Sequence, residues 1–131
     1  MPVRQFDSEG SRSGRLEDDE MIETLLFDEL QKRTKFPVYP KVPETPPDRF
    51  LVLHKTGASF ENQISTSTIA VQSYGESTFD AATINETVKE AMLSLTDLDE
   101  ISAVSLNSDY DYTDTQEKKD CYQAVFVITH Y

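Results

Sequence analysis

The segment TIAVQSYGESTFDAATINETVKEAMLSL, residues 68–95, constrains the fold of this chain more than any other. Its first residues alternate between large apolar and smaller or polar side chains, which predicts a half-buried β-strand. Gly75 permits a turn after the strand, and Ser77 and Asp80 have the spacing of a weak helix capping box. Apolar residues then recur every three or four positions, which predicts an amphipathic helix that buries one stripe. That stripe comprises Ala81, Ile84, Val88, Ala91 or Met92, and Leu95.

Length and composition restrict the class of protein. A chain of 131 residues fits one folding unit with a real core. The net charge of -12 argues against a surface that neutralises nucleic-acid phosphates or anionic lipid. Cys121 is the single cysteine, so the sequence predicts no internal disulfide and no paired-cysteine zinc motif. The chain lacks the long apolar run of a membrane helix or a signal peptide, and we expect a soluble protein made in a reducing cytoplasm.

The N-terminal part divides into an arm and a helix. Residues 1–17 contain glycine, serine and arginine but few apolar side chains, which predicts a flexible arm that includes Arg4 and Arg12. An apolar stripe at helical spacing, with acidic residues first and basic residues last, predicts a helix over residues 18–34. Residues 18–131 are then expected to form a single domain.

A proline-rich connector follows this helix. Five of the six prolines lie in residues 37–48, and Pro37, Pro40, Pro43 and Pro46 are spaced by three, the repeat of a polyproline II helix. The spacing predicts a stiff, extended spacer laid across the domain. The alternative is a displayed ligand for an aromatic groove of another protein.

Four strands are expected in all, over residues 49–55, 68–74, 101–107 and 122–130. A polar loop or extended hairpin over residues 57–65 joins the first two. The order helix, strand, strand, helix, strand, strand predicts an α+β two-layer sandwich with a mixed or antiparallel sheet of about four strands. If the second and third strands are parallel neighbours, the helix between them is a right-handed crossover.

The sequence contains little that indicates catalysis. The two histidines, His54 and His130, both fall in predicted strands and are far apart in sequence. No nucleophile elbow, phosphate loop or dinucleotide glycine motif occurs. We therefore predict no catalytic residue, no metal ligand and no cofactor.

One acidic segment, residues 97–120, has eight carboxylates against Lys118 and Lys119, a local net charge of -6. It has three interpretations. Asp109, Asp111 and Asp114 resemble a degenerate calcium loop, although the required glycine and the final glutamate are missing. Alternatively, the segment is a solvated loop between antiparallel strands, with two tyrosines packed at its base. Repeated around a ring, it would line a negative surface that DNA passes without binding.

Taken together, the order of elements resembles the tail terminator or tail completion proteins of long-tailed bacteriophages. The resemblance covers residues 18–131 and rests on four stretches, namely FPVYPKVPETPPDRFLVLHKTG, TIAVQSYGES with its helix, AVSLNSDYDYTD, and the closing strand CYQAVFVITHY. The arm before Asp18 and the high density of acidic residues in 97–120 have no counterpart that we can match to the family.

The resemblance implies a virion protein that forms a ring, typically a hexamer, and caps the tail tube. Such a ring stops tail polymerisation, presents the head-joining surface, and has no active site. The implied partners are other copies of the chain, the tail tube protein and a head-completion or connector protein, while DNA only passes through the lumen. A head-side neck protein is one alternative, and an acidic metal-dependent hydrolase is an alternative from another class.

A closed ring needs two different complementary patches on each subunit. Phe60 is the expected aromatic anchor of one patch, unless it folds back onto its own core. The expected interface residues are Phe60, Glu61, Asn62, Arg4 and Arg12, and the expected lumen residues are Asp109, Asp111 and Asp114.

Overall fold

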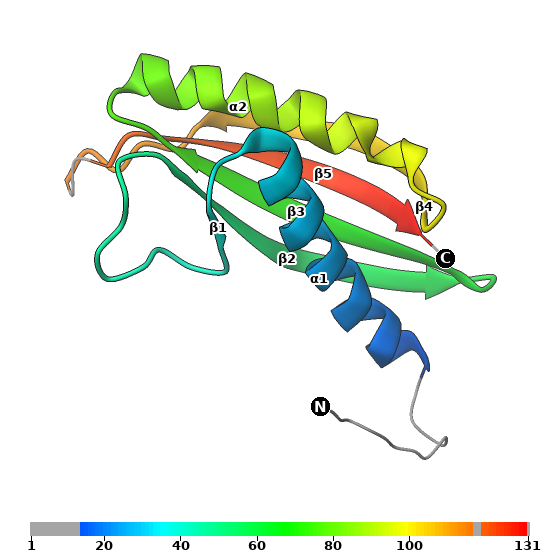
Figure 1. Ribbon diagram of the computed structural model, residues 1–131. Coiled ribbons are helices and arrows are strands. Elements are labelled where there is room, and N and C mark those ends of the chain that lie inside the picture. Colours follow the sequence, from blue (N-terminus) through cyan, green and yellow to red (C-terminus); the bar gives the residue numbers. More distant parts are fainter. Residues whose placement is uncertain (1–13, 117–118, 131) are drawn as a thin grey trace.

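The computed structural model describes residues 14–116 and 119–130 (Figure 1). In chain order the elements are α1 (Gly14–Thr34), β1 (Val38–Tyr39), β2 (Phe50–Glu61), β3 (Ile64–Tyr74), α2 (Thr78–Leu93), the short 3₁₀ helix η1 (Ser94–Asp97), β4 (Ile101–Asp111) and β5 (Cys121–His130). The predicted α+β class is confirmed. The sheet is mixed and has five strands, one more than predicted, because the short β1 pairs in parallel with β2.

The strand order in the sheet is β1-β2-β3-β5-β4. Strand β5 lies between β3 and β4 and pairs antiparallel with both. The prediction that β3 and β4 could be parallel neighbours is therefore wrong: they run in the same direction but are separated by β5. The physical reason is that the apolar, β-branched β5 is the best central strand of the chain, so it takes the place between them.

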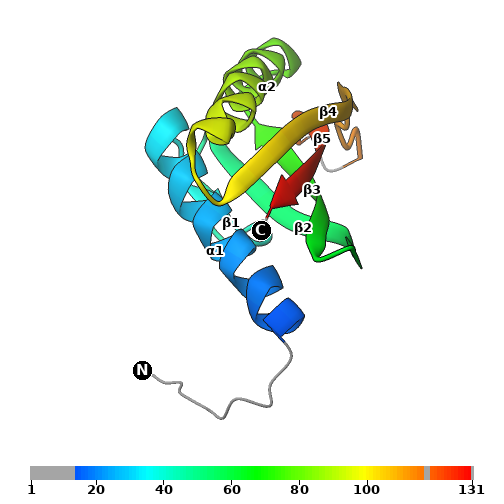
Figure 2. The ribbon, with the colours of Figure 1, turned by 90° about the vertical axis from the view of Figure 1, so that its right-hand side faces the viewer.

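Both helices lie on one face of the sheet, as Figure 2 shows from the side. The core between these layers is one cluster of apolar side chains. From the helices it takes Ile22, Leu26, Leu30, Ile84, Val88, Ala91, Met92 and Leu95, and from the strands Leu51, Leu53, Ile69, Val71, Ile101, Ala124, Phe126 and Ile128. The opposite face of the sheet, called the open face below, carries the alternate residues, including Val125 and Thr129.

Helix α1 begins at Gly14, earlier than the predicted residue 18, and ends at Thr34 as predicted. Lys35 has a φ of 68°, the left-handed conformation that often terminates a helix. Its backbone N–H donates to the carbonyl of Gln31 at 2.9 Å. The helix therefore ends three residues before Pro37.

The connector after α1 is not the straight polyproline II spacer that the proline spacing predicted. Val38 and Tyr39 form β1, opposite Leu51 and Val52. The chain then bends several times and loops away from the sheet before it returns as β2 (Figure 1). A parallel strand pair fixes β1 because Val38 and Tyr39 are β-formers that sit between prolines rather than at them.

The strand–turn–helix unit is present, and its cap extends beyond the predicted pair. Ser77 Oγ accepts from the Asp80 backbone N–H at 3.0 Å, as a capping residue does. The Asp80 carboxylate does not return the bond to Ser77. It accepts from the Glu76 N–H at 2.9 Å and from Arg49 Nε at 2.8 Å. The cap therefore joins the start of α2 to the residue that precedes β2.

Gly75 does not have a positive φ, so its backbone conformation does not require a glycine. The requirement comes from the lack of space for a side chain. A Cβ atom at this position would lie 2.7 Å from the Ala81 backbone nitrogen and 2.8 Å from Asp80 Oδ2. Those are distances that real Cβ atoms do not adopt, so the strand can approach the first turn of α2 only through a glycine.

We predict that Gly75→Ala destabilises the protein by about 1 to 3 kcal/mol, the usual cost of forced overpacking. The matched control is Gly57→Ala, because a Cβ there would meet nothing closer than 3.9 Å. Urea unfolding of both variants measures the difference. Equal stability of the two variants would contradict the close approach at Gly75.

A second pair tests which face of β5 is core. Phe126 is fully buried under the helices, whereas its neighbour Val125 is only half-buried on the open face. We predict that Phe126→Ala costs about 3 to 5 kcal/mol of unfolding free energy and Val125→Ala about 1 kcal/mol or less. Calorimetry of the two variants measures both losses. A larger loss for Val125→Ala than for Phe126→Ala would contradict the assignment of the Phe126 face of β5 to the core.

Candidate assembly surfaces

Two strands at opposite ends of the sheet expose an edge. Strand β1 covers β2 only at Leu51 and Val52. Beyond Val52 no strand among the described residues pairs with the outer edge of β2, and none pairs with the outer edge of β4. The outward backbone N–H and C=O groups of such edges are a template for pairing with another chain.

A long stretch of each edge is uncharged. In β4 the eight residues from Ile101 to Ser108, ISAVSLNS, contain no charge and no proline, and in β2 the five residues from Thr56 to Phe60 contain none either. Proteins that keep an edge strand from pairing usually place lysine, proline or an inward charge on it. These two stretches carry no lysine, proline or charge that would oppose pairing with another strand.

The edge strands also carry the irregularities of the sheet. Register shifts occur between Lys55 and Gly57 in β2, and at two places in β4. The central pair β3 and β5 is regular from Ser65 to Tyr74. Bulges increase local twist and bend the bulged strand, so they curve the outer strands of the sheet (Figure 2).

Of the two forms expected for residues 57–65, the extended hairpin is confirmed and the polar loop is wrong, because β2 and β3 stay paired as far as Glu61 and Ile64. Only Asn62 and Gln63 form the turn, with φ values of 51° and 66°. Two successive positive φ values define a type I′ turn, which fits the twist of the flanking strands. The sequence lacks the Asn-Gly pair that normally marks this turn, which is why the hairpin was not predicted over its full length.

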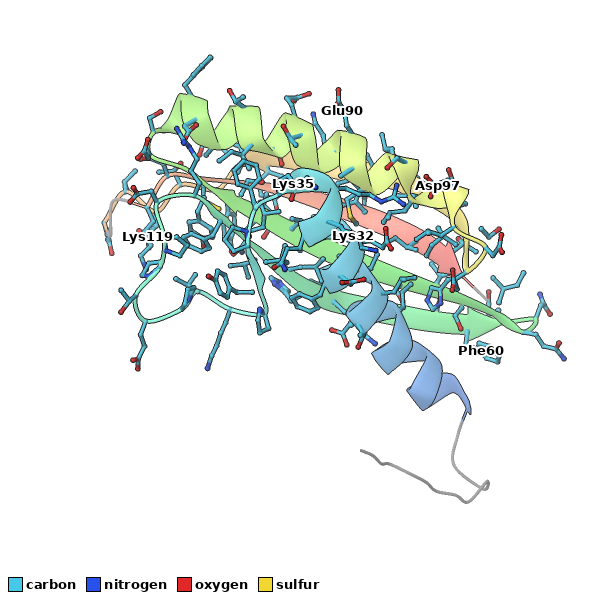
Figure 3. The ribbon with its side chains drawn as sticks, viewed as in Figure 1. Lys32, Lys35, Phe60, Glu90, Asp97 and Lys119 are labelled. Carbon is cyan, nitrogen blue, oxygen red and sulfur yellow. The ribbon has the colours of Figure 1, made fainter. Side chains whose placement is uncertain are left out.

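The hairpin tip carries two exposed apolar side chains, Phe60 at 40% and Ile64 at 44% of their full exposure. Figure 3 shows Phe60 close to the tip. Its cross-strand partner Ser65 is on the helix-covered side, whereas Ile64 lies on the open face. Of the expected interface residues, the structure thus brings together Phe60, Glu61 and Asn62, while Arg4 and Arg12 lie outside the described residues.

Within the acidic segment 97–120, strand β4 covers Ile101–Asp111 and so extends four residues beyond the predicted 101–107, while the predicted loop between two antiparallel strands is confined to the part after Asp111. Asp109 and Asp111 belong to β4, and only the segment after Asp111 turns back toward β5. Asp109 Oδ2 accepts from Lys89 Nζ at 2.9 Å and from Asn85 Nδ2 at 3.0 Å, both on α2. Asp109 therefore helps to hold β4 against the helix, a role that the sequence did not indicate.

The other two acidic candidates lie beyond this contact. Hydrogen bonds from Thr113 lower the pKa of the Asp111 carboxyl below its usual value. Asp114 forms a bridge with Lys119 through backbone hydrogen bonds of 3.1 Å in both directions. Among the described residues, no three His, Cys, Asp or Glu side chains gather where they could hold a metal ion.

Two tyrosines were predicted to pack at the base of this turn, and the structure places them in contact with each other there. Tyr110 and Tyr112 form an edge-to-face pair with ring centroids 6.1 Å apart, and both stay partly exposed at 42% and 49%. The Tyr110 hydroxyl accepts from Gln123 Nε2 at 2.6 Å. The pair therefore packs on the open face rather than into the core.

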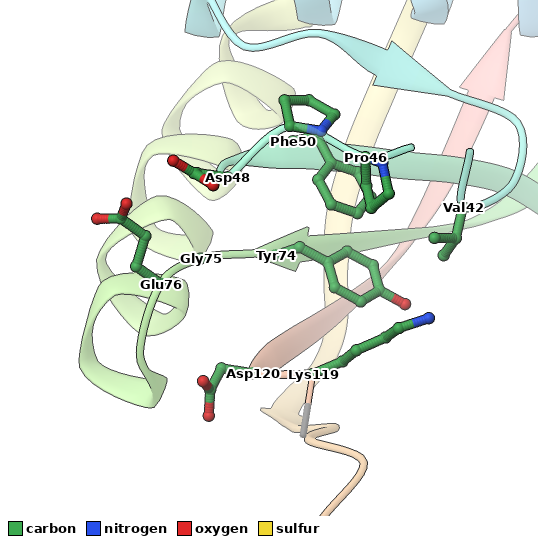
Figure 4. A pocket seen from close by; sticks show the side chains of 10 residues that line it. Val42, Pro46, Asp48, Phe50, Tyr74, Gly75, Glu76, Lys119 and Asp120 are labelled. Atoms are coloured by element: carbon green, nitrogen blue, oxygen red, sulfur yellow. The ribbon is translucent and has the colours of Figure 1, made fainter. Parts of the chain in front are cut away.

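A cleft of about 410 Å³ lies between the connector and the ends of β2 and β3. Phe50 and Tyr74 stack in it with centroids 4.6 Å apart and planes 2° from parallel, and Figure 4 shows Pro46 beside them. Burial is the main reason that the pKa of Tyr74 is raised. The remaining lining is Val42, Pro47, Asp48, Gly75, Glu76, Lys119 and Asp120.

The histidines and the cysteine do not form a reactive group. His54 pairs with Ala70 and His130 with Ser65, so they lie on opposite faces of the sheet and do not meet. His130 is 2% exposed, and its Nε2 is 2.9 Å from Ser67 Oγ, which is itself fully buried. Desolvation raises the pKa of the Cys121 thiol to about 12, so the reactive thiolate is scarce at neutral pH.

The sequence matches no protein-family model, and a search of curated proteins finds no significant match. No helix in the described part of the chain is long and apolar enough to cross a membrane. The geometry of the chain's own surfaces therefore carries the functional argument.

Gln63 offers a test of the hairpin turn. A non-glycine residue in the left-handed conformation costs about 1 kcal/mol, so Gln63→Gly should raise the unfolding free energy by roughly that amount. Gln63→Ala is the control and should give no gain. Thermal unfolding measures both variants, and a loss of stability in the glycine variant would mean that the turn has another conformation.

Proposed function

We propose that the protein is a structural subunit of a long-tailed bacteriophage, one that forms a ring, hexameric by the resemblance, on the end of the finished tail tube. The ring stops tube polymerisation and presents the surface to which the head-side connector attaches. Support comes from the resemblance of residues 18–131 to tail terminator proteins, which includes the strand–turn–helix unit and the closing strand β5.

The observation that carries the proposal is that, among the described residues, no strand pairs with the outer edge of β4 or with that of β2 beyond Val52. A ring closes by rotation only if each subunit has two different surfaces that fit each other. The edges differ in sequence, lie at opposite sides of one sheet, and each contain an uncharged stretch. A monomeric protein would have reason to protect both of them with charge.

The two ends of the sheet are proposed to meet different partners. The hairpin tip, with Phe60 and Ile64 exposed, is suited to an apolar contact with the tail tube. At the opposite end Asp111 and Asp114 accompany the carboxylates of the cleft, and this acidic end repels DNA that passes through the ring. Asp109 is ion-paired with Lys89, so it contributes less to that field.

Deleting the gene from the phage tests this function. We expect tails of abnormal length that are not joined to heads, because nothing then stops polymerisation. Tails of normal length together with heads that lose DNA would instead assign the protein to the head side of the neck. Normal infectious particles would contradict both positions. Complementation with the unaltered gene is the control and should restore joined particles.

A further inference from the structure

We propose that strand β4 of one copy pairs with strand β2 of the next, in antiparallel sense, so that the sheets of all copies join around the ring. This inference rests on the proposed function, since it names the contact by which the ring closes. It follows from strand direction, from the composition of the edges and from the side chains beside them.

The directions of the strands fit such a contact. Strand β3 is antiparallel to β2 and to β5, and β4 is antiparallel to β5, so β2 and β4 run in opposite directions. A rotation about an axis along the strands leaves these directions unchanged. Each copy therefore offers its β2 edge to a neighbouring β4 that runs the opposite way, which is the sense of an antiparallel pair.

The available stretches of the two edges lie at the same level of the sheet. Ser59 is opposite Thr66, Thr66 is opposite Thr129, and Thr129 is opposite Ala103. At the other end, β1 already occupies β2 at Leu51 and Val52. The acidic end of β4 lies at the level where β1 already covers β2. The part of β4 that can pair with the free stretch of β2 is therefore its uncharged part.

Exposed apolar side chains border both edges on the helix-covered side. Leu106 of β4 is 37% exposed, and its strand partner Phe126 belongs to the core. Phe60 of β2 is 40% exposed on the same side. Phe60 lies at the level of Ile101 and Leu106 at the level of Lys55, so pairing would cover each of them with the neighbouring strand and reduce its exposure to water.

Engineered cysteines test the contact. Within one chain Ser59 and Ala103 are separated by β3 and β5, a distance of about 14 Å from strand spacing, too far for a disulfide. A disulfide between these positions must therefore join two copies. The buried Cys121, with its raised pKa, stays out of the reaction.

Purified Ser59→Cys is mixed in turn with Ala103→Cys, Ser105→Cys and Ser108→Cys, and each mixture is oxidised. The three β4 positions are all exposed and lie on the open face, and together they cover the stagger that ring closure imposes. At least one mixture should shift from monomer to covalent dimer on a non-reducing gel. A chain carrying both matching cysteines should give a ladder of multimers.

The controls separate this contact from others. Ser59→Cys mixed with Glu90→Cys, on the exposed side of α2 (Figure 3), should stay monomeric. Covalent dimers from any one variant alone would show two-fold pairing of like edges and would overturn the inference. A closed ring in native mass spectrometry without any β2–β4 cross-link would also overturn it, while leaving the proposed function standing. Monomers without cross-links at every concentration would contradict both.

Discussion

In the part of the chain that the structure describes, no further strand pairs with the outer edge of β4 or with that of β2 beyond Val52, and this constraint underlies the rest of the structure. The helices α1 and α2 cover the apolar face of the sheet, and Phe126 and Leu26 are fully buried between the two layers. They do nothing for the hydrogen-bonding groups at the edges of β2 and β4. Backbone N–H and C=O groups form hydrogen bonds wherever a partner is available. The core of the fold is fully packed, while the two sheet edges can therefore still accept another strand.

Local features were largely predictable from the sequence, whereas pairing was not. Helix α2 and its capping residue Ser77 follow from spacing alone, because both depend on residues within one turn. Arg49, which completes the cap through Asp80, lies 31 residues away in sequence, and no local pattern links them. The insertion of β5 between β3 and β4 is equally a matter of long-range pairing.

The acidic residues 97–120 show why part of the candidate site was missed. A strand is recognised by alternation when one face is buried, but in β4 only Ile101 is buried and Val104 half-buried. The strand was therefore predicted only as far as residue 107, and its last four residues, which include Asp109 and Asp111, were assigned to the loop. Phe60, Glu61 and Asn62 lie together at the tip of the hairpin, one of the two forms expected for this segment, and their role at an interface stays a prediction. The uncharged edges were not anticipated at all, because an edge exists only once the strand order is known.

Electron microscopy of the purified assembly, at a resolution that separates strands, tests the central claim most directly. We expect a closed ring in which β4 of each subunit lies about 4.8 Å from an antiparallel β2 of the next. The hairpin tips with Phe60 should project from one rim, and the acidic turns after Asp111 from the other. A protein that remains monomeric at high concentration and on tail tubes, or a ring held together by its helices with both sheet edges in solvent, would contradict it.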